Sequence, residues 1–586
     1  MKASDFVAHY LKARGVTHVF ELVGGMITHL LDSISSAGQV NIVSCHHEQA
    51  AAFAAEGFAR TTGIPGIALA TSGPGATNLL TAVGSCFFDS TPSVFITGQV
   101  NTHELRGERG IRQLGFQETD IVAMARPVCK SAVQVKNAED LPSLLESAFR
   151  QALQGRQGPC LVDIPMNVQS EEIDDAIANQ WLESSSYSIS IVNRDTDIPN
   201  DQKQMQQHFK SLLKAISHAE RPLLLMGGGC AATSSRQAAQ RIADQLHIPV
   251  VLSLMAVDLL PESHHNRVGF IGSYGNRWAN KALGAADFLL VLGSRLDIRQ
   301  TGSDLDSFCD GKQIWQIDID SAEIGVRIKP QHSLCCSIQE ASDYLRELEV
   351  TPNPQHEAWL GWINELRVKF PASLEYFADA GEVNPIDLLQ KVSSYMSTSC
   401  HYVTDVGQHQ MWAAQSLRFK RNDRFLTSGG MGAMGFGLPA AIGSAIADPK
   451  MTILISGDGS FQVNIQELET AKRNHLNLKI IIFNNRCHGM VRQFQESYFR
   501  GKLQSTVDGY SAPDFSAVSR AYGIPARRLA CGDEVDEAIH WLLHSNGPAL
   551  LEASLSIHSK VYPKLAFGRR FGEMEPEVSP VAMEST

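Results

Sequence analysis

Short apolar runs separated by helix-length segments recur along this chain in three blocks. A strand that is buried on both faces is apolar along its whole length, so such runs predict parallel β-strands joined by α-helices. The runs lie at 19–20, 40–44, 66–70, 93–98 and 160–164, then at 223–226, 249–253, 288–292 and 313–319, and finally at 402–404, 452–456, 479–483 and 549–553. The pattern predicts an α/β protein with three doubly wound parallel sheets.

Polar intervals divide the blocks and predict the domain boundaries. With 586 residues and a usual domain size of about 150 residues, the chain is long enough for three or four domains. The predicted organisation is a domain at 1–170, a linker at 171–206, a domain at 207–350, a linker at 351–375, a domain at 376–566 and a C-terminal tail at 567–586.

Charge and cysteine content narrow the classes of partner and compartment. The chain has 50 Lys and Arg against 62 Asp and Glu, a net charge of −12, which argues against a broad nucleic-acid or anionic-membrane surface. Eleven scattered cysteines without a CxxC pair indicate reduced thiols. The amino terminus lacks an uninterrupted apolar signal core, so we expect a cytoplasmic protein.

The stretch 454–495 carries the strongest chemical signal. Its first strand ends at Gly457-Asp458-Gly459 and its second at Asn484-Asn485, and the carboxyl ends of parallel strands share one sheet edge, where open sheets bind ligands. A carboxylate with neutral oxygens is typical of an Mg²⁺ site rather than a zinc site. Gly-Asp-Gly alone is usually an ordinary turn, but the Asn pair strengthens the prediction.

Two motifs in the first block have both ordinary and chemical interpretations. Glu48 begins a helix whose small face is Ala50, Ala51, Ala54 and Ala55, and a lone Glu there is by default a carboxylate favoured by the helix dipole. The loop 71–78 has two glycines of a dinucleotide fingerprint but Asn78 in place of the third, so a structural turn is favoured.

Three further segments could line a pocket. Phe116 and Gln117 fit the wall of a small substrate pocket, with core packing as the alternative for Phe116. Gln408 and His409 follow a strand and Gly407, where they could bind diphosphate oxygens together with helix amides. Met434 stands among six glycines at 429–443, and gap filling in a core is the usual role of such a Met.

These motifs together resemble the acetolactate synthase large-subunit type of thiamine diphosphate enzyme. The matching segments are HEQAAAFAAEGFAR, TSGPGATN, GFQETD, TDVGQHQMWAAQ, GGMGAMGFGLPAAIG, GDGSFQVNIQELET and NNRCHGMVRQFQ, in family order over nearly the whole chain. The resemblance implies pyrimidine-binding, central and diphosphate-binding domains, thiamine diphosphate and Mg²⁺, and a homodimer or homotetramer with active sites between subunits.

The resemblance also assigns roles to residues. Mg²⁺ would be held by Asp458, by the Asn485 side chain and by the backbone carbonyl of Cys487. Glu48 would face N1′ of the aminopyrimidine, where a sequestered carboxyl group helps a proton leave the thiazolium C2. The implied catalytic residues are Glu48, Phe116, Gln117 and Met434. The implied thiamine-site residues are Gly407, Gln408, His409, Gly432, Met434, Gly457, Asp458, Gly459, Ser460, Asn485, Gly489 and Met490.

The central block decides whether FAD is expected. A GxGxxA interpretation of the glycines that start at Gly227 is weak by itself. Other segments resemble FAD-binding segments of the acetolactate synthases, and Arg299 matches the family arginine near the second substrate, with a surface ion pair as its alternative. The residues assigned to the FAD site are Arg156, Gly227, Gly228, Gly272, Gly293, Arg295, Asp297, Arg299 and Asp318.

Departures from the family concern the second substrate. Glu21-Leu22-Val23 stands where the family usually has Gly-Tyr-Pro, and Phe494 stands where it usually has Trp; both lie by analogy near the acceptor. A family acidic position of the flavin site falls near Cys335-Cys336.

Three hypotheses follow. The first is a carboligase that decarboxylates pyruvate and joins the two-carbon unit to a second carbonyl compound, by default another pyruvate or else a larger ketone such as a nucleotide-linked keto sugar. The second is an FAD-dependent pyruvate oxidase. The third is a silent homologue that only binds a partner, against which the retained Glu48, Asp458, Asn485 and Met434 argue.

Overall fold

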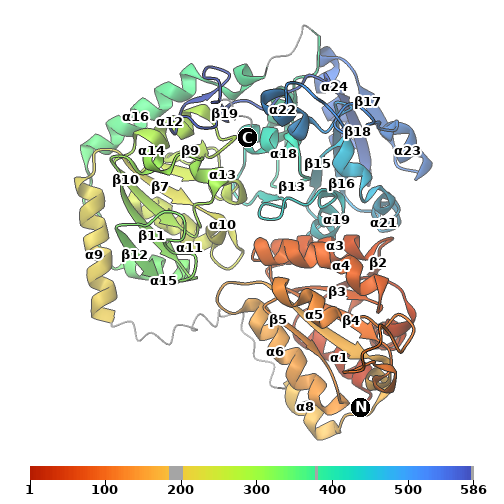
Figure 1. Cartoon of the computed structure of the whole chain (residues 1–586). Coiled ribbons are helices and arrows are strands. Elements are labelled where there is room, and N and C mark those ends of the chain that lie inside the picture. The colour runs from red at the N-terminus through yellow and green to blue at the C-terminus, as the bar shows by residue number, and fades with distance from the viewer. Residues whose placement is uncertain (184–201, 377–380, 582–586) are drawn as a thin grey trace. The chain divides into compact units, whose positions relative to one another are not determined.

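Three six-stranded parallel sheets with helices on both faces form the framework of the molecule (Figure 1). The computed structural model describes residues 1–183, 202–376 and 381–581. The predicted fold class is confirmed, because each of the three blocks forms one sheet. Among the described residues, no helix combines the length and the apolar character that crossing a bilayer requires.

The first sheet has the strand order β2-β1-β3-β4-β6-β5. Its strands are β1 (His18–Leu22), β2 (Asn41–Ser44), β3 (Gly66–Ala70), β4 (Ser93–Gln99), β5 (Ser131–Gln134) and β6 (Pro159–Pro165). Its helices are α1 (Ala3–Ala13), α2 (Thr28–Ala37), α3 (Glu48–Thr62), α4 (Pro74–Phe88), α5 (Ile121–Ala125), α6 (Leu141–Leu153), α7 (Met166–Ser170) and α8 (Asp175–Glu183). One face packs on α1, α2 and α6, and α3 and α4 lie together on the opposite side in Figure 1.

The second sheet has the order β12-β11-β10-β7-β8-β9. Its strands are β7 (Pro222–Met226), β8 (Val250–Leu252), β9 (Arg267–Phe270), β10 (Phe288–Leu292), β11 (Gln313–Asp318) and β12 (His332–Cys335). Its helices are α9 (Gln202–His218), α10 (Gly228–Ala231), α11 (Arg236–Leu246), α12 (Arg277–Ala285), α13 (Ile298–Thr301), α14 (Leu305–Cys309), α15 (Ile338–Arg346) and α16 (Pro354–Lys369). Leu224 packs with the cluster on α9, α11 and α15, while Leu223 and Leu225 pack with α12 and α16, which explains why β7 is apolar throughout.

The third sheet has the order β14-β13-β15-β16-β18-β17. Its strands are β13 (His401–Thr404), β14 (Arg424–Leu426), β15 (Thr452–Gly457), β16 (Leu478–Asn484), β17 (Ala526–Leu529) and β18 (Ala549–Ser554). Its helices are α17 (Pro385–Tyr395), α18 (Gln408–Ser416), α19 (Gly437–Ala447), α20 (Asp458–Gln462), α21 (Leu468–Arg473), α22 (Gly489–Tyr498), α23 (Phe515–Ala521) and α24 (Val535–His544). A short hairpin of β19 (Lys564–Leu565) and β20 (Met574–Glu575) follows.

The described chain divides into two compact units. The first holds residues 1–183 together with Ser428–Thr452 and Gln462–Leu478, and the second holds the remaining described residues, 202–376, 381–427, 453–461 and 479–581. In the first unit, α3 and α19 approach so closely that a Cβ atom at Gly443 would lie 1.9 Å from the carbonyl oxygen of Ala54. The small face predicted for the helix that begins at Glu48 is therefore a helix contact.

The predicted linkers and tail lie partly outside the described residues. Of the interval 171–206, residues 184–201 are not described; α8 precedes them and α9 follows them. The interval 351–375 contains α16, whose Trp359 and Ile363 lie in the core beside the second sheet. In the interval 567–586, β20 pairs with β19, and residues 582–586 are not described.

Some strands of the described chain were not among the predicted runs. β5, β9, β12, β14 and β17 each lie at an edge of a six-stranded sheet, and β19 and β20 form the hairpin.

Candidate active site

The ends of β15 and β16 meet at one edge of the third sheet. β15 is buried throughout and ends at Gly457, and α20 begins directly at Asp458. β16 is its neighbour in the sheet and ends at Asn484, so Asn485 follows at the same edge. Both strands predicted for 454–495 are therefore present with their ends at one edge, while the start of α20 stands where a glycine turn was predicted.

His409 is held between two glycines at this edge. A Cβ atom at Gly457 would lie 2.8 Å from His409 Nδ1, and one at Gly407 would lie 2.6 Å from Cε1, so neither position has room for a larger residue. The ring hydrogen-bonds to the backbone of Asp405, and burial lowers the pKa of His409 to about 3. Nε2 is buried and has no hydrogen-bond partner among the described residues, which is the state expected of an atom reserved for a ligand.

Gln408 connects the start of α18 to the Asn485 turn. Its Nε2 donates to the backbone carbonyl of Ser559 over 2.8 Å, and its Oε1 accepts from Asn485 Nδ2 over 2.8 Å. Gly489 leaves space for this contact, because a Cβ atom there would lie 2.0 Å from Gln408 Oε1. Both ends of the Gln408 amide are thus engaged by protein groups.

Asp458 lies inside this arrangement with a perturbed acidity. Burial raises the pKa of the Asp458 carboxyl to about 6, and hydrogen bonds from the backbone N–H of Gly459 and from the Tyr510 hydroxyl oppose the rise. Tyr510 also contacts the His488 ring edge to face, at 4.5 Å between centroids. Ser460 donates its hydroxyl to the Val406 carbonyl over 2.7 Å and so braces the turn.

The donor set at this turn suits a hard cation. Asp458 supplies a carboxylate and Asn485 an amide oxygen, while the Cys487 backbone carbonyl accepts from Gly489 N–H and keeps a second lone pair. Burial raises the pKa of the Cys487 thiol to about 11, which disfavours a thiolate ligand. Across the described ranges, no three His, Cys, Asp or Glu side chains form a competing metal cluster. Met490 follows, half-buried, in α22.

Glu48 lies in the first unit at the first position of α3. Its side chain is buried, and Oε2 accepts from Asn78 Nδ2 over 2.9 Å. Gly75 is required beside it, because a Cβ atom there would lie 3.2 Å from Glu48 Oε1 and 2.8 Å from the Thr71 methyl group. Gly75 therefore makes room for Glu48 and Thr71. It lies in α4, which begins at Pro74, so only residues 71–73 of the predicted turn are outside a helix.

Phe116 and Gln117 lie over the same loop. Gln117 has φ +65°, and a Cβ atom at Gly73 would lie 3.0 Å from its own Cβ atom. Phe116 is 79% exposed in the single chain, which excludes core packing as its role there. The structure thus groups Glu48, the 71–78 loop and Gln117 within the first unit.

The glycine loop that carries Met434 is tied down at its start. Backbone N–H groups of Gly429 and Gly430 donate to the Asp89 carboxylate over 2.9 and 2.6 Å. Gly432 has φ +65°, which suits a glycine. Met434 is 37% exposed, so it is not a buried gap filler in the single chain.

The central glycines have a packing explanation. Gly227 follows β7 and Gly293 follows the neighbouring β10, and a Cβ atom at Gly227 would lie 2.2 Å from the Gly293 carbonyl oxygen. A Cβ atom at Gly228 would lie 3.2 Å from Met255, and one at Gly272 would lie 2.4 Å from the Arg299 carbonyl oxygen. These glycines let turns at one sheet edge approach each other, whether or not a dinucleotide lies beside them.

The charged residues of the predicted flavin site lie either at the carboxyl edge of the second sheet or in the first unit. Asp297 caps α13 by accepting from Arg299 N–H over 2.8 Å, and it pairs with Arg295 at 3.5 Å. Asp318 is buried at the end of β11. Arg156 belongs to the first unit, where its Nε donates to Ser90 Oγ over 3.0 Å.

Several partners in these contacts were missed by sequence reasoning. Asn78 and Ser559 bond to residues 30 and 151 positions away, and Tyr510 lies in a segment with no recognised motif. For Asn78 the signal was present, since it replaces the third glycine of the loop.

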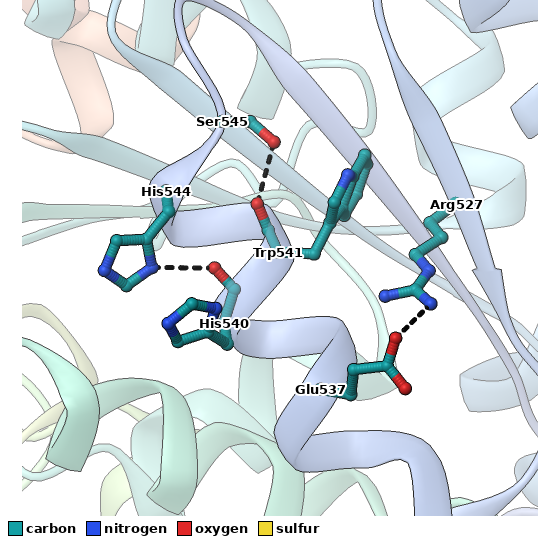
Figure 2. A pocket seen from close by; sticks show the side chains of 6 residues that line it. All are labelled: Arg527, Glu537, His540, Trp541, His544 and Ser545. Atoms are coloured by element: carbon teal, nitrogen blue, oxygen red, sulfur yellow. Dashed lines mark hydrogen bonds and ion pairs between the residues drawn. The ribbon is translucent and has the colours of Figure 1, made fainter.

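Figure 2 shows a surface hollow that contains none of the predicted residues. It is lined by Arg527, Glu537, His540, Trp541, His544 and Ser545. Glu537 pairs with Arg527 at 2.6 Å, and His544 Nδ1 bonds to the His540 carbonyl at 2.8 Å, so these contacts are local to α24 and its neighbouring strand.

Comparisons with known proteins match all three sheets. The family model "Thiamine pyrophosphate enzyme, N-terminal TPP binding domain" matches residues 1–124, the central-domain model matches 209–348, and the C-terminal TPP binding domain model matches 405–553. Acetolactate synthase 2, chloroplastic, of Nicotiana tabacum is 35% identical over 98% of this chain and 85% of its own length. Acetolactate synthase isozyme 2 large subunit of Escherichia coli strain K12 is 34% identical over 99% of this chain and 100% of its own length.

Proposed function

The chain belongs to the acetolactate synthase family of thiamine pyrophosphate enzymes, and on this premise we propose that it is a carboligase that decarboxylates pyruvate and transfers the two-carbon unit to a second carbonyl compound. The observation that carries the proposal is the sheet edge where Asp458, Asn485 and the unpartnered Nε2 of His409 gather. Glu48, held by Asn78, supports it from the first unit.

The residues of the second unit fit thiamine diphosphate with Mg²⁺. Asp458, Asn485 Oδ1 and the Cys487 carbonyl would hold the metal, and His409, Gly457, Gly459 and the start of α18 would hold the diphosphate. When bound, the cofactor supplies an electron sink for decarboxylation. Ser460, Gly489 and Met490 shape the same turns.

Glu48 would serve as the proton-relaying acid at N1′ of the aminopyrimidine when the cofactor is bound. Asn78 donates to Oε2 and orients the carboxyl group, so Oε1 is the oxygen that would exchange a proton with the cofactor. Gly75 leaves space beside Oε1. Met434 and Gly432 would support the cofactor rings, and Phe116 and Gln117 would line the substrate side.

A second pyruvate is the default acceptor, which Arg299 would meet as a bidentate partner of its carboxylate. A larger ketone, such as a nucleotide-linked keto sugar, is the alternative. The alternative rests on the departures from the family at Val23 and Phe494, both of which are exposed in the single chain. Glu21 is buried and accepts from Ser44 Oγ over 2.5 Å, so its carboxylate contributes less to this argument.

FAD is proposed as a second cofactor near Arg295, Asp297 and Asp318, with Arg156 assigned by the same resemblance. If FAD were redox-active, the protein would be a pyruvate oxidase. Anaerobic pyruvate should leave the absorbance of bound FAD unchanged on the timescale of turnover if FAD has no redox role. Bleaching at the turnover rate would favour the oxidase.

The assembly and compartment complete the proposal. We place the active site between two subunits of a homodimer or homotetramer, and the protein in the cytoplasm with small-molecule substrates. All eleven cysteines lie within the described residues and are free thiols, which supports a reducing compartment.

Mass spectrometry of the products tests the function. Pyruvate is supplied alone and then with a panel of ketones, aldehydes and 2-oxoacids, with thiamine diphosphate, Mg²⁺ and FAD present. We expect slow release of acetolactate or acetaldehyde from pyruvate alone, and severalfold faster pyruvate consumption with a bulky ketone if the pocket accepts one. Fast and exclusive acetolactate formation would select the second pyruvate, and no pyruvate consumption under any condition would contradict the carboligase.

A further inference from the structure

We propose that Gln408 is a positioning residue, which holds the Asn485 amide so that its oxygen, and not its NH₂ group, faces the metal position. The inference rests on the proposed function, because it assigns a role toward the Mg²⁺ of that site. It assigns to the Gln408 side chain a task other than contact with the diphosphate.

The polarity of the hydrogen bonds determines the orientation. A backbone carbonyl only accepts, so the end of Gln408 that faces Ser559 O at 2.8 Å is its NH₂ group. The other end is then Oε1, which needs a donor. Asn485 must present Nδ2 to it, at 2.8 Å, and this turns Asn485 Oδ1 away from Gln408. An isolated Asn has no such constraint, since its two amide ends have nearly the same shape.

Neighbouring groups hold the hydrogen bonds from Asn485 to Gln408 and from Gln408 to Ser559 in place. Gln408, Asn485 and Ser559 are all nearly fully buried, so water does not readily substitute for any member. The buried Arg492 guanidinium also donates to Ser559 O, which leaves that carbonyl with two donors. Only glycine fits at position 489 beside these hydrogen bonds, because a Cβ atom there would lie 2.0 Å from Gln408 Oε1 and 2.9 Å from Asn485 Nδ2.

A wrongly oriented Asn485 would present two N–H groups to a cation. Loss of a group that orients a metal ligand typically weakens metal binding by about 10- to 100-fold. A direct contact between Gln408 and the diphosphate would also weaken cofactor binding when removed, so the test must separate the two roles.

The test compares Gln408→Met in two backgrounds. Methionine has similar length but cannot orient an amide. Binding of Mn²⁺, as a paramagnetic substitute for Mg²⁺, is measured by electron paramagnetic resonance on the full-length protein with saturating thiamine diphosphate. We expect Mn²⁺ affinity to fall at least about 10-fold. In an Asn485→Asp background either orientation presents an oxygen, so Gln408→Met should change the affinity less than about twofold there.

Two further variants keep the inference falsifiable. Gln415→Met is the matched control, since Gln415 lies on the same helix and donates to a backbone carbonyl, that of Tyr274, over 2.8 Å; it should bind Mn²⁺ like the wild type. If Gln408→Met does not fold, Gln408→Glu replaces it. In its neutral form the buried glutamic acid donates its O–H to Ser559 O and still accepts from Asn485 Nδ2, so Mn²⁺ affinity should stay within a few-fold of the wild type, whereas a diphosphate contact made by the amide N–H groups predicts a strong loss.

The possible results distinguish failure of the positioning role from failure of the proposed function. Equal losses for Gln408→Met in both backgrounds would overturn the positioning role and favour the diphosphate contact. Unchanged Mn²⁺ affinity in Gln408→Met would overturn it as well. A wild-type protein that binds no Mn²⁺ with thiamine diphosphate would overturn the proposed function and the inference with it.

Discussion

His409 illustrates how local packing sets the chemistry of one side chain. The glycines on either side exclude water from the ring, and burial lowers its pKa to about 3, so the imidazole is neutral at physiological pH. A neutral imidazole donates only one N–H, and the hydrogen bond to Asp405 favours the charged form only weakly against burial.

The depressed pKa of His409 predicts a loss of stability in acid. The unfolded chain binds the proton near pH 6.5 and the folded chain near pH 3, so stability is complete above pH 6.5 and falls between pH 6.5 and 3. Between pH 7.5 and 5, this amounts to about 2 kcal/mol. Thermal unfolding of the cofactor-free protein should therefore depend more steeply on pH in the wild type than in His409→Asn. His475→Asn removes an exposed histidine and should keep the wild-type dependence; equal slopes in the wild type and His409→Asn would contradict the prediction.

Glu48→Gln should abolish turnover and leave cofactor binding intact. Glutamine keeps the shape and still accepts from Asn78, but it cannot relay a proton, and general acid–base groups typically contribute about 10²- to 10⁴-fold to rate. Pyruvate consumption and thiamine diphosphate affinity are measured on the same sample. Turnover near that of the wild type would contradict the proposed role of Glu48.

At the scale of elements, the contact between α3 and α19 depends on glycine. Gly57 would place a Cβ atom 2.2 Å from the Ala440 carbonyl oxygen, and Gly443 would place one 1.9 Å from that of Ala54. The backbones are the neighbours in both cases, so a side chain cannot be accommodated by rotamer changes and the helices must separate.

Gly443→Ala should therefore destabilise the protein by about 1–3 kcal/mol or more, the usual range for overpacking. Gly361 provides the matched control, because it lies in α16 and a Cβ atom there would have no neighbouring atom within 4 Å. Gly361→Ala should be neutral or stabilising by about 0.4–1 kcal/mol, since alanine favours the helix and restricts the unfolded chain. Thermal unfolding followed by circular dichroism distinguishes the two, and equal effects would refute the packing argument.

Central strands were predicted from the sequence more successfully than edge strands. Central strands such as β3 and β10 are buried on both faces, and both were predicted with the bounds that they have. Edge strands have one partner, and most of the missed ones are partly exposed: β5 is intermediate at all four residues and β17 contains two arginines, whereas β9 is buried but only four residues long. Their sequences do not form an apolar run, so all five strands that were missed in the large sheets are edges.

The site divides in a similar way. Residues within a motif, such as Asp458 and Asn485, were located because strand ends of one sheet share an edge. The group that anchors their neighbour Gln408 was not predicted. Ser559 bonds to Gln408 across 151 positions, and no local sequence pattern indicates a contact at that separation. The helix start at Glu48 was predicted, whereas its partner Asn78 required the structure.

At the scale of the whole molecule, the proposed catalytic groups lie in two compact units. Glu48 and Met434 belong to the first, and Asp458 and Asn485 belong to the second. A site shared between subunits would join the first unit of one chain to the second unit of another, as the proposed homodimer requires.

Co-expression of Glu48→Gln and Asp458→Ala tests this arrangement. Each variant alone is expected to be inactive, because one lacks the proton relay and the other lacks the carboxylate that binds Mg²⁺. In a mixed dimer of two-fold symmetry, one site collects both substitutions and the other has none. If half of the dimers are mixed and each has one intact site, activity should return to about a quarter of the wild-type value.

The control pair Asp458→Ala and Asn485→Ala places both substitutions in the second unit, so every site keeps one defect and no activity should return. If Glu48→Gln and Asp458→Ala chains form mixed dimers, detected with two affinity tags, and remain inactive, then each active site is built from a single chain.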